Sequence, residues 1–258
     1  MRVVSLASGS GGNAYAVEGG GATLLIDCGL AYFTLVKRAL AAGVNLDALC
    51  GVLFTHEHTD HVRGADVFRK KRPGVPFFAN HMTAEAIERS LTGAARFLCF
   101  EPGQPFAAGP FAVEAFPVPH DVCDPVGFLV RCGGVTYFHA TDVGAPLASI
   151  GAKFAAADLA TLESNHDAQL LRMSARPQSL KSRISGPRGH LSNDDAAALA
   201  AAYASTRLKY LALAHLSSEC NAPHIAERTM RDALQRAGKH AVALEILSQD
   251  TPSKGWIC

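Results

Sequence analysis

The stretch Thr55-His56-Glu57-His58-Thr59-Asp60-His61 places three histidines and an aspartate within six residues. The apolar segment Gly51-Val52-Leu53-Phe54 directly before it predicts a buried strand, and the spacing of residues 62–72 after it predicts a helix. The side chains therefore converge in a strand-to-helix turn. Imidazoles and a carboxylate that meet in one turn favour a metal site over a solvated, histidine-rich turn.

The composition is that of a globular protein. The chain has 258 residues, of which 48% are hydrophobic, enough to bury a substantial core. The net charge of +1 gives no overall bias toward nucleic acid or membranes, so any contact with a polyanion must come from a local patch. Because no linker, charge block or repeat interrupts the chain, we expect a single domain over residues 1–258.

The cysteines and the first residues bear on the compartment. Seven cysteines, at positions 28, 50, 99, 123, 132, 220 and 258, form no C-x-x-C pair, which is typical of reduced thiols rather than of a disulfide framework. The first residues lead directly into a strand pattern, and no apolar run is long enough to span a bilayer. We expect a cytoplasmic protein without a membrane partner, and the sequence leaves the oligomeric state open.

The apolar patterns predict a mixed α/β chain. Strands are expected at residues 3–7, 15–18, 22–26, 51–54, 75–79, 96–100, 111–118, 126–131, 135–139, 159–162, 209–214 and 241–247. Helices are expected at residues 31–42, 62–72, 82–91, 145–156 and 222–237, and an alanine-rich helix is expected to begin at Ser192 or Asn193 as its N-cap. The tail, residues 248–258, is expected to be poorly ordered.

A glycine-rich segment, Ser8-Gly9-Ser10-Gly11-Gly12-Asn13, contains a G-x-G-x-x-A pattern together with Ala14. A dinucleotide-binding fold would require a helix next, whereas two strands joined by three glycines are expected to follow. We therefore reject that fold. The small residues suit either a tight turn or a close approach of the backbone to another element or to a phosphate.

Histidines and an aspartate also follow later predicted strands. Loops held by a rigid scaffold often carry functional residues, and His120, Asp142 and His215 lie in such positions. A catalytic zinc site needs only three protein ligands and a water, so the full set suits two metal ions. Mixed histidine and carboxylate ligands accept Zn, Mn or Fe. The candidate ligands are His56, His58, Asp60, His61, His120, Asp142 and His215.

Residues 168–193 contain five basic side chains and no acidic residue. The basic residues are Arg172, Arg176, Lys181, Arg183 and Arg188. This local patch indicates either a nucleic-acid-binding surface or an ordinary solvated face. His166 and His190 flank the patch. Each could protonate a leaving group, bind phosphate, or simply lie in a loop or cap a helix.

The H-x-H-x-D-H pattern after a strand, followed by isolated His, Asp and His at later strand ends, resembles the metallo-β-lactamase superfamily over almost the whole chain. Asp27 matches its first motif. The resemblance implies an α/β (α+β) fold, a four-layer αββα sandwich with the metals at one edge of its two sheets. It also implies that one metal is bound by His56, His58 and His120, the other by Asp60, His61 and His215, and that Asp142 bridges them. Asp142, where some true β-lactamases carry cysteine, argues against antibiotic hydrolysis.

Shorter motifs are similar to the YycJ/WalJ-like branch of bacterial DNA exonucleases. They are the glycine-rich segment, Glu163-Ser164-Asn165-His166-Asp167, Gly189-His190-Leu191-Ser192-Asn193, and Ala214-His215-Leu216-Ser217 followed by Asn221. Cys220 departs from the pattern, where a polar residue would be expected. The resemblance implies a DNA substrate, and the residues expected to bind it are Ser8, Ser10, Asn13, Asn165, Arg183, Arg188 and Asn193.

The leading hypothesis is a dinuclear-metal-dependent phosphodiesterase, a 5′ exonuclease acting on DNA. Its catalytic candidates are Asp60, which would also hold the attacking water, and His190 and His166, which would stabilise the leaving oxygen. A second hypothesis is a hydrolase of the same fold acting on small cyclic phosphodiesters, lactones or thioesters. A third is a non-catalytic nucleic-acid-binding module, against which the complete ligand set argues.

Overall fold

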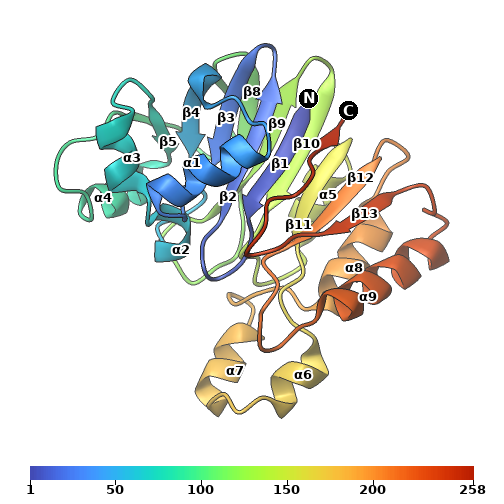
Figure 1. Ribbon diagram of the computed structural model, residues 1–258. Helices are drawn as coiled ribbons and strands as arrows, with labels where there is room; N and C mark the ends of the chain where they lie inside the picture. The colour runs from blue at the N-terminus through green and yellow to red at the C-terminus, as the bar shows by residue number, and fades with distance from the viewer. The chain divides into compact units, whose positions relative to one another are not determined.

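The computed structural model describes residues 1–258, which form two compact units (Figure 1). Unit 1 comprises Met1–Pro117, Val122–Gly134 and Ser248–Cys258, and unit 2 comprises Val118–Asp121 and Val135–Leu247. The expectation of a single domain over residues 1–258 stays a prediction. None of the helices is both long enough and apolar enough to cross a membrane.

Unit 1 is built around a sheet with the strand order β14-β1-β2-β3-β4-β5-β6. Its strands are β1 (Arg2–Ala7), β2 (Ala14–Gly19), β3 (Ala22–Ile26), β4 (Leu49–Leu53), β5 (Phe77–Ala79), β6 (Phe97–Cys99) and β14 (Trp256–Ile257). Three further strands pair antiparallel in this unit: β7 (Phe106–Ala108), β8 (Phe111–Pro117) and β9 (Val126–Cys132). The helical segments are α1 (Tyr32–Ala41), η1 (Leu46–Ala48), α2 (Thr59–Val62), α3 (Ala65–Lys71) and α4 (His81–Glu88).

The core of unit 1 lies between this sheet and its helices. Leu35 of α1, Phe68 of α3 and Ile87 of α4 are buried in one cluster with apolar side chains of β1 to β5. These helices bury one apolar face each because their hydrophobic residues recur at helical spacing. The loops at the strand ends are thereby fixed on a rigid base.

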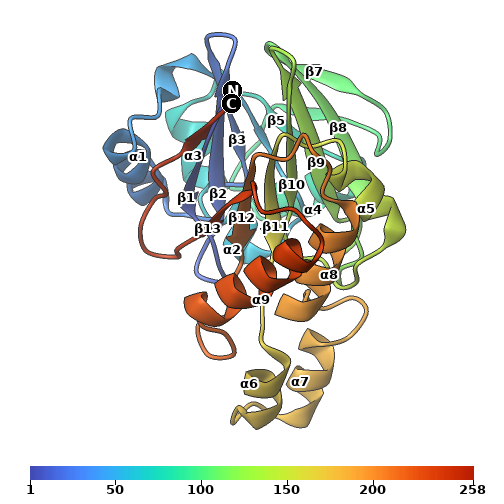
Figure 2. The ribbon, with the colours of Figure 1, turned by 90° about the vertical axis from the view of Figure 1, so that its right-hand side faces the viewer.

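Unit 2 contains four parallel strands in the order β10-β11-β12-β13. They are β10 (Val135–Ala140), β11 (Leu159–Glu163), β12 (Tyr210–Ala214) and β13 (Ala243–Ile246). Its helices are α5 (Ala148–Phe154), α6 (Ala168–Met173), α7 (Gln178–Ile184), α8 (Asn193–Tyr203) and α9 (Pro223–Arg236). Helix α8 packs against α5 and α9, whereas α6 and α7 project away from the strands of this unit in both views (Figures 1 and 2).

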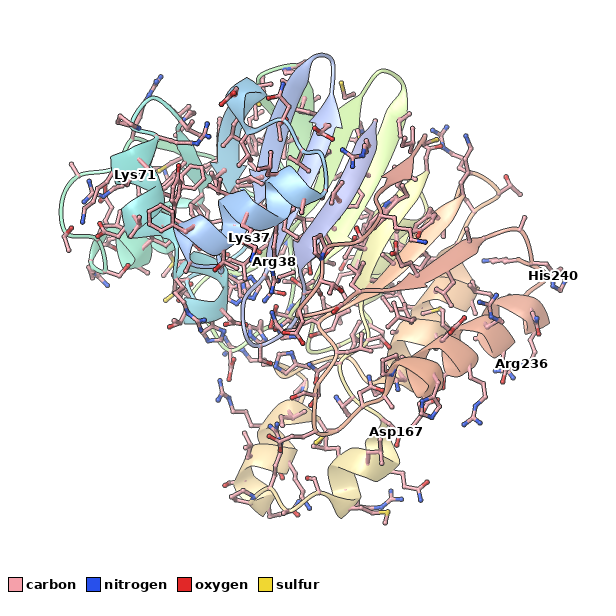
Figure 3. The ribbon with its side chains drawn as sticks, viewed as in Figure 1. Lys37, Arg38, Lys71, Asp167, Arg236 and His240 are labelled. Atoms are coloured by element: carbon pink, nitrogen blue, oxygen red, sulfur yellow. The ribbon has the colours of Figure 1, made fainter.

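Two polar side chains begin helices in unit 2. Ser192 accepts a hydrogen bond from the backbone N–H of Asp195, which confirms Ser192 as the N-cap of α8. Asp167, labelled in Figure 3, accepts hydrogen bonds from the N–H groups of Gln169 and Leu170 and caps α6. The residues directly before Asp167 and Ser192 are therefore held in place at the ends of their loops.

The expected strands are present, with ends shifted by at most a few residues. The expected helix over residues 62–72 is present as α3 (Ala65–Lys71), but its expected start at residue 62 is wrong, because a separate helix, α2, spans Thr59–Val62 inside the histidine-rich stretch. Gly64 separates the two helices because its backbone packs against another loop. A Cβ on Gly64 would lie 2.2 Å from the carbonyl oxygen of Leu30. The backbone N–H of Gly64 donates a hydrogen bond to the carbonyl of Cys28 at 2.8 Å.

The expectation of a poorly ordered tail is also wrong. Strand β14 pairs antiparallel with β1, and the Trp256 side chain is buried. Arg38 of α1, labelled in Figure 3, donates to the carbonyl of Gln249 at 2.8 Å and to that of Leu6 at 3.1 Å. The tail therefore closes the edge of the sheet of unit 1.

The tail also explains two glycines of the segment 8–13. The Gln249 side chain accepts a hydrogen bond from Gly11 N–H at 2.7 Å and donates to the carbonyl of Gly12 at 3.0 Å. A Cβ on Gly9 or Gly11 would lie 2.7–2.9 Å from this side chain. Both alternatives from the sequence are thus present, because Gly9 also has a φ of 140° and its carbonyl accepts from the Gly12 N–H at 3.0 Å in a tight turn.

Replacing Gln249 by alanine is expected to lower the free energy of unfolding by about 1 kcal/mol, because two hydrogen bonds to the glycine-rich loop are lost. For a chain of this size the melting temperature should fall by about 2–4 °C. Differential scanning calorimetry measures the change. Ile257→Ala is the matched control in the same tail, because Ile257 is 77% exposed. Equal melting temperatures for the Gln249 variant and wild type would show that the tail does not stabilise this loop.

Candidate metal centre

Parallel strands place the polar residues of each unit at one edge. In unit 1, β3 and β4 run parallel, and Asp27 and the stretch 55–61 directly follow their carboxyl ends. In unit 2, Asp142, Glu163 and His215 lie at the carboxyl ends of β10, β11 and β12. Ligand sites in α/β sheets form at this edge.

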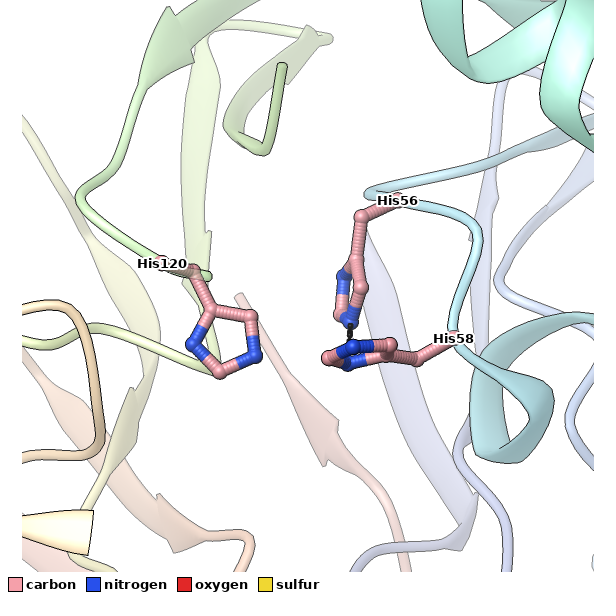
Figure 4. Close-up of side chains that lie close together, drawn as sticks. All are labelled: His56, His58 and His120. Carbon is pink, nitrogen blue, oxygen red and sulfur yellow. Dashed lines mark hydrogen bonds between the residues drawn. The ribbon is translucent and has the colours of Figure 1, made fainter. Parts of the chain in front are cut away.

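The histidines of unit 1 form pairs. His56 Nε2 lies 3.2 Å from His58 Nδ1, and Figure 4 shows these two rings joined by that hydrogen bond. His61 Nε2 lies 3.5 Å from a carboxylate oxygen of Asp60. His56 and His61 are fully buried, so their nitrogens are fixed rather than solvated.

Asp27 orients His61. Its carboxylate accepts from His61 Nδ1 at 2.8 Å, from the Thr55 N–H at 2.9 Å and from the Thr55 hydroxyl at 3.0 Å. This contact places the N–H on Nδ1 and leaves Nε2 as a lone-pair donor, which is the usual support of a metal-binding histidine. Burial raises the pKa of the Asp27 carboxyl more than these contacts lower it. A cation on His61 would favour the ionised carboxylate.

The glycine-rich loop supports Asp60. The Asn13 side chain donates to an Asp60 carboxylate oxygen at 3.3 Å and accepts from Gly9 N–H at 2.9 Å. Ser8 is buried and accepts from the Tyr15 hydroxyl at 2.8 Å, whereas Ser10 is exposed. Asn13 and Ser8 are thus held by the protein, and the substrate-binding roles expected for Ser8, Ser10 and Asn13 stay predictions.

Unit 2 brings four acidic and histidine side chains together. Asp142, Glu163, His190 and His215 each offer a ligand atom within 4.8 Å of the others. An Asp142 oxygen lies 3.6 Å from His190 Nδ1 and 3.7 Å from His215 Nε2. The same oxygen lies 3.7 Å from Nε2 of His120. The structure therefore groups two predicted ligands, His120 and His215, and the predicted catalytic residue His190 around the carboxylate of Asp142.

Glu163, the first residue of the 163–167 motif, is a site residue for which the sequence predicted no role. Its buried carboxylate accepts from His190 Nδ1 at 2.8 Å, from the N–H of Val143 at 2.7 Å and from the N–H of Leu191 at 3.1 Å, and it lies 3.3 Å from His215 Nδ1. The available signal was its position, since Glu163 ends a strand as Ala214 does before His215.

Glu163 and His190 shift each other's protonation. Burial alone would raise the pKa of Glu163, but the charge and hydrogen bond of His190 lower it below its usual range. Burial alone would lower the pKa of His190, and the Glu163 carboxylate reverses this, leaving that pKa raised. The pair is therefore an ionised carboxylate beside a histidine that readily carries a proton.

The His120 ring and backbone are held by hydrogen bonds from the segment 188–189 of the basic patch. Its Nδ1 bonds the carbonyl of Gly189 at 2.9 Å, which leaves Nε2 as the ligand atom (Figure 4 also draws this ring). Arg188 donates to the carbonyl of His120 at 3.0 Å, and Arg183 forms an ion pair with Asp121. Both arginines thus contact the His120 loop, and their expected contact with DNA stays a prediction.

The other predicted residues of unit 2 occupy different positions. Asn165 donates to the carbonyl of His215 at 2.8 Å and so holds a candidate ligand. Asn193 is buried and bonds Ser164 at 2.6 Å and Asn221 at 2.9 Å. His166 does not belong to the cluster of four and lines a cavity at α6 and α7 instead.

Backbone strain coincides with these clusters. The three non-glycine residues with positive φ are Asp27 (61°), Asp142 (56°) and His215 (55°). Each such residue costs about 1–3 kcal/mol and persists only where the surroundings enforce it, commonly at functional sites.

The candidate metal ligands of both clusters are imidazole nitrogens and carboxylate oxygens. In several of the histidines the second ring nitrogen is hydrogen-bonded to a carboxylate or a carbonyl. This chemistry fits divalent metal ions.

Cys123, three residues after His120 in the sequence, is exposed. Its N–H donates to the Glu57 carboxylate at 3.3 Å, and that carboxylate raises the pKa of the thiol by hydrogen bonding and charge. The loop after residue 121 therefore leaves this side chain at the surface.

Comparison with known proteins identifies the family. The model of the β-lactamase superfamily domain matches residues 22–212. Exodeoxyribonuclease YycJ of Bacillus anthracis is 33% identical over 90% of this chain and 89% of its own length, and exodeoxyribonuclease WalJ of Streptococcus pneumoniae is 32% identical over 90% and 87%. The crystal structure of the metallo-β-lactamase fold protein YhfI from Bacillus subtilis matches with a TM-score of 0.72 and 20% identity, covering 98% of each chain.

These similarities confirm the predicted fold class, the α/β (α+β) sandwich of the metallo-β-lactamase superfamily, and the predicted YycJ/WalJ-like branch. The chain belongs to the β-lactamase superfamily and, within it, to the family of the YycJ and WalJ exodeoxyribonucleases.

Proposed function

We propose that this protein is a dinuclear-metal-dependent phosphodiesterase that degrades DNA as a 5′ exonuclease. The observation that carries the proposal is a preorganised donor cluster at the parallel-strand edge of each unit, in which carboxylates or carbonyls orient the histidines. The relatives named exodeoxyribonuclease support a DNA substrate. The basic patch of residues 168–193 is consistent with that polyanion.

The ligand assignment is part of the proposal. One metal would be held by His56, His58 and His120, the other by Asp60, His61 and His215, with Asp142 between them. Zn, Mn and Fe all suit this mixture of nitrogen and oxygen donors. When bound, such ions polarise a phosphodiester and lower the pKa of a water molecule. Neither the donor clusters nor the relatives bear on the cytoplasmic location or the oligomeric state, and the location stays a prediction.

The protein groups supply orientation and protons. Asp60, held by Asn13, would accept a hydrogen bond from the attacking water and align it with phosphorus. His190 would donate from Nε2 to the leaving oxygen, because Nδ1 is engaged by Glu163, which favours the protonated ring. His166, the other acid considered from the sequence, is separate from the cluster, so we assign the proton to His190.

Degradation of DNA and its polarity are tested together. Strands labelled at the 5′ end should release labelled mononucleotide or short products at once, whereas 3′-labelled strands should shorten progressively. EDTA should abolish both, and added Mn²⁺ or Zn²⁺ should restore them, with the metal content of the protein measured by elemental analysis. Intact DNA with metal shown to be bound would refute the nuclease. Hydrolysis of bis-p-nitrophenyl phosphate alone would then favour a small-substrate hydrolase.

A further inference from the structure

A cavity separate from the metal ligands lies between α6, α7 and the start of the α6 loop in unit 2. It has a volume of about 300 Å³. Its polar lining comes from His166, Arg172, Gln178, Lys181 and Ser185, and no acidic side chain lines it. A cavity with two cations and no carboxylate attracts an anion.

His166 lies at the buried edge of this cavity. The residue is 2% exposed, and its Nδ1 is buried without a hydrogen-bond partner. Such a nitrogen costs about 1–3 kcal/mol and calls for an explanation. Burial lowers the pKa of His166, so the neutral ring offers one N–H donor rather than a charge.

The two cations are available to a ligand. Lys181 of α7 donates to the carbonyl of Arg172 at 2.7 Å, which fixes its ammonium across the two helices and leaves two N–H donors. Neither Lys181 nor Arg172 forms an ion pair. By contrast, Arg176, in the same helical hairpin but outside the cavity lining, is engaged by the Glu219 carboxylate at 3.1 Å. Fixed donors with uncompensated charge suit the oxygens of a phosphate.

The chain places this cavity close to the metal cluster. Glu163 binds His190, Asn165 holds His215, and His166 lines the cavity as the next residue. Three residues of extended chain span about 10 Å at most, so the cavity lies within about three nucleotides of the cluster along a DNA strand.

We propose that the cavity lined by His166, Arg172 and Lys181 binds a phosphate of the DNA strand within about three nucleotides of the one that is cleaved. The inference rests on the proposed function and names a subsite for its substrate. The phosphate comes either from the 5′ end of the strand or from an internal phosphodiester. Its role is to hold the strand while the scissile phosphate occupies the metal centre.

The test measures DNA affinity of the metal-loaded protein by fluorescence anisotropy. The probe is a single-stranded oligonucleotide with phosphorothioate terminal linkages, so that it survives the measurement. Arg172→Gln and Lys181→Gln should each weaken binding about five- to tenfold. Each should also reduce the slope of log affinity against log salt by about 0.7, the value for one lost contact to a single strand. Arg228→Gln is the control, because Arg228 is an exposed residue of α9 outside the basic patch, and it should leave both quantities unchanged.

Two versions of the probe, with a 5′-phosphate and with a 5′-hydroxyl, identify the source of the phosphate. Weakening confined to the 5′-phosphorylated strand assigns the cavity to the terminal phosphate, and weakening with both assigns it to an internal one. Affinities equal to wild type for both variants would overturn the proposal. Degradation of labelled DNA is scored separately. If the DNA stays intact but binding depends on Arg172, only the proposed nuclease activity is refuted. If DNA is degraded normally and the variants bind it like wild type, only the proposed phosphate site is refuted.

Discussion

Replacing Asp142 by asparagine is expected to slow DNA hydrolysis by about three orders of magnitude, which corresponds to about 4 kcal/mol of transition-state stabilisation. Asp142 lies at the centre of the cluster in unit 2, with one oxygen 3.6–3.7 Å from nitrogens of His190, His215 and His120. Asparagine keeps the shape but removes the negative charge that would offset two cations. The protein should therefore bind less metal as well as react more slowly.

Initial rates on labelled DNA and metal content per chain measure the two effects of Asp142→Asn. Asp232→Asn is the matched control, because Asp232 is an exposed residue of α9. The backbone of Asp142 has a φ of 56°, which asparagine tolerates well, so the fold should persist. A rate within tenfold of wild type, with two metals still bound, would contradict the bridging role.

The sequence predicted most of the site because its residues follow strands. An apolar strand that ends in a histidine or aspartate is visible locally, and parallel strands bring such ends to one edge of a sheet. His56, His58, Asp142 and His215 were found in this way. Their partners were harder to find because the bonds connect residues far apart in sequence. Asp27 was noted only through family resemblance, although its carboxylate holds His61, 34 residues away.

The wrong predictions also arise from contacts between residues that are far apart in the sequence. The tail was expected to be poorly ordered because the last residues of a chain often are, yet Gln249 bonds Gly11, 238 residues away. The helix break at Gly64 depends on the carbonyl of Leu30, which no local pattern shows. Glu163 lies at a strand end like the identified ligands, but its function depends on His190 in a distant loop. Local periodicity predicts elements, and long-range contacts decide their ends and their partners.

Glu163→Gln is expected to lower the free energy of unfolding by about 3–5 kcal/mol, because it breaks a buried ion pair and leaves its partners unsatisfied. The carboxylate accepts hydrogen bonds from His190 and from the backbone N–H groups of Val143 and Leu191. A glutamine has one acceptor oxygen and two N–H donors, so at least one donor would face another donor. The melting temperature should fall by about 10 °C, measured by calorimetry.

Glu163→Gln also distinguishes a residue that orients the metal-binding histidines from a residue that binds the metal itself. Glu163 holds His190 and lies beside His215, so its loss should weaken metal affinity by about 10–100-fold, the range for residues that orient ligands. Saturating metal should then restore full metal occupancy, which it would not do for Asp142→Asn, while the rate stays below wild type because His190 has lost the carboxylate that favours its protonated ring. Glu227→Gln, which removes an exposed ion pair with Arg231, should change stability by less than about 0.5 kcal/mol. A Glu163 variant with unchanged melting temperature and metal affinity would mean that the backbone, not this carboxylate, fixes the two histidines.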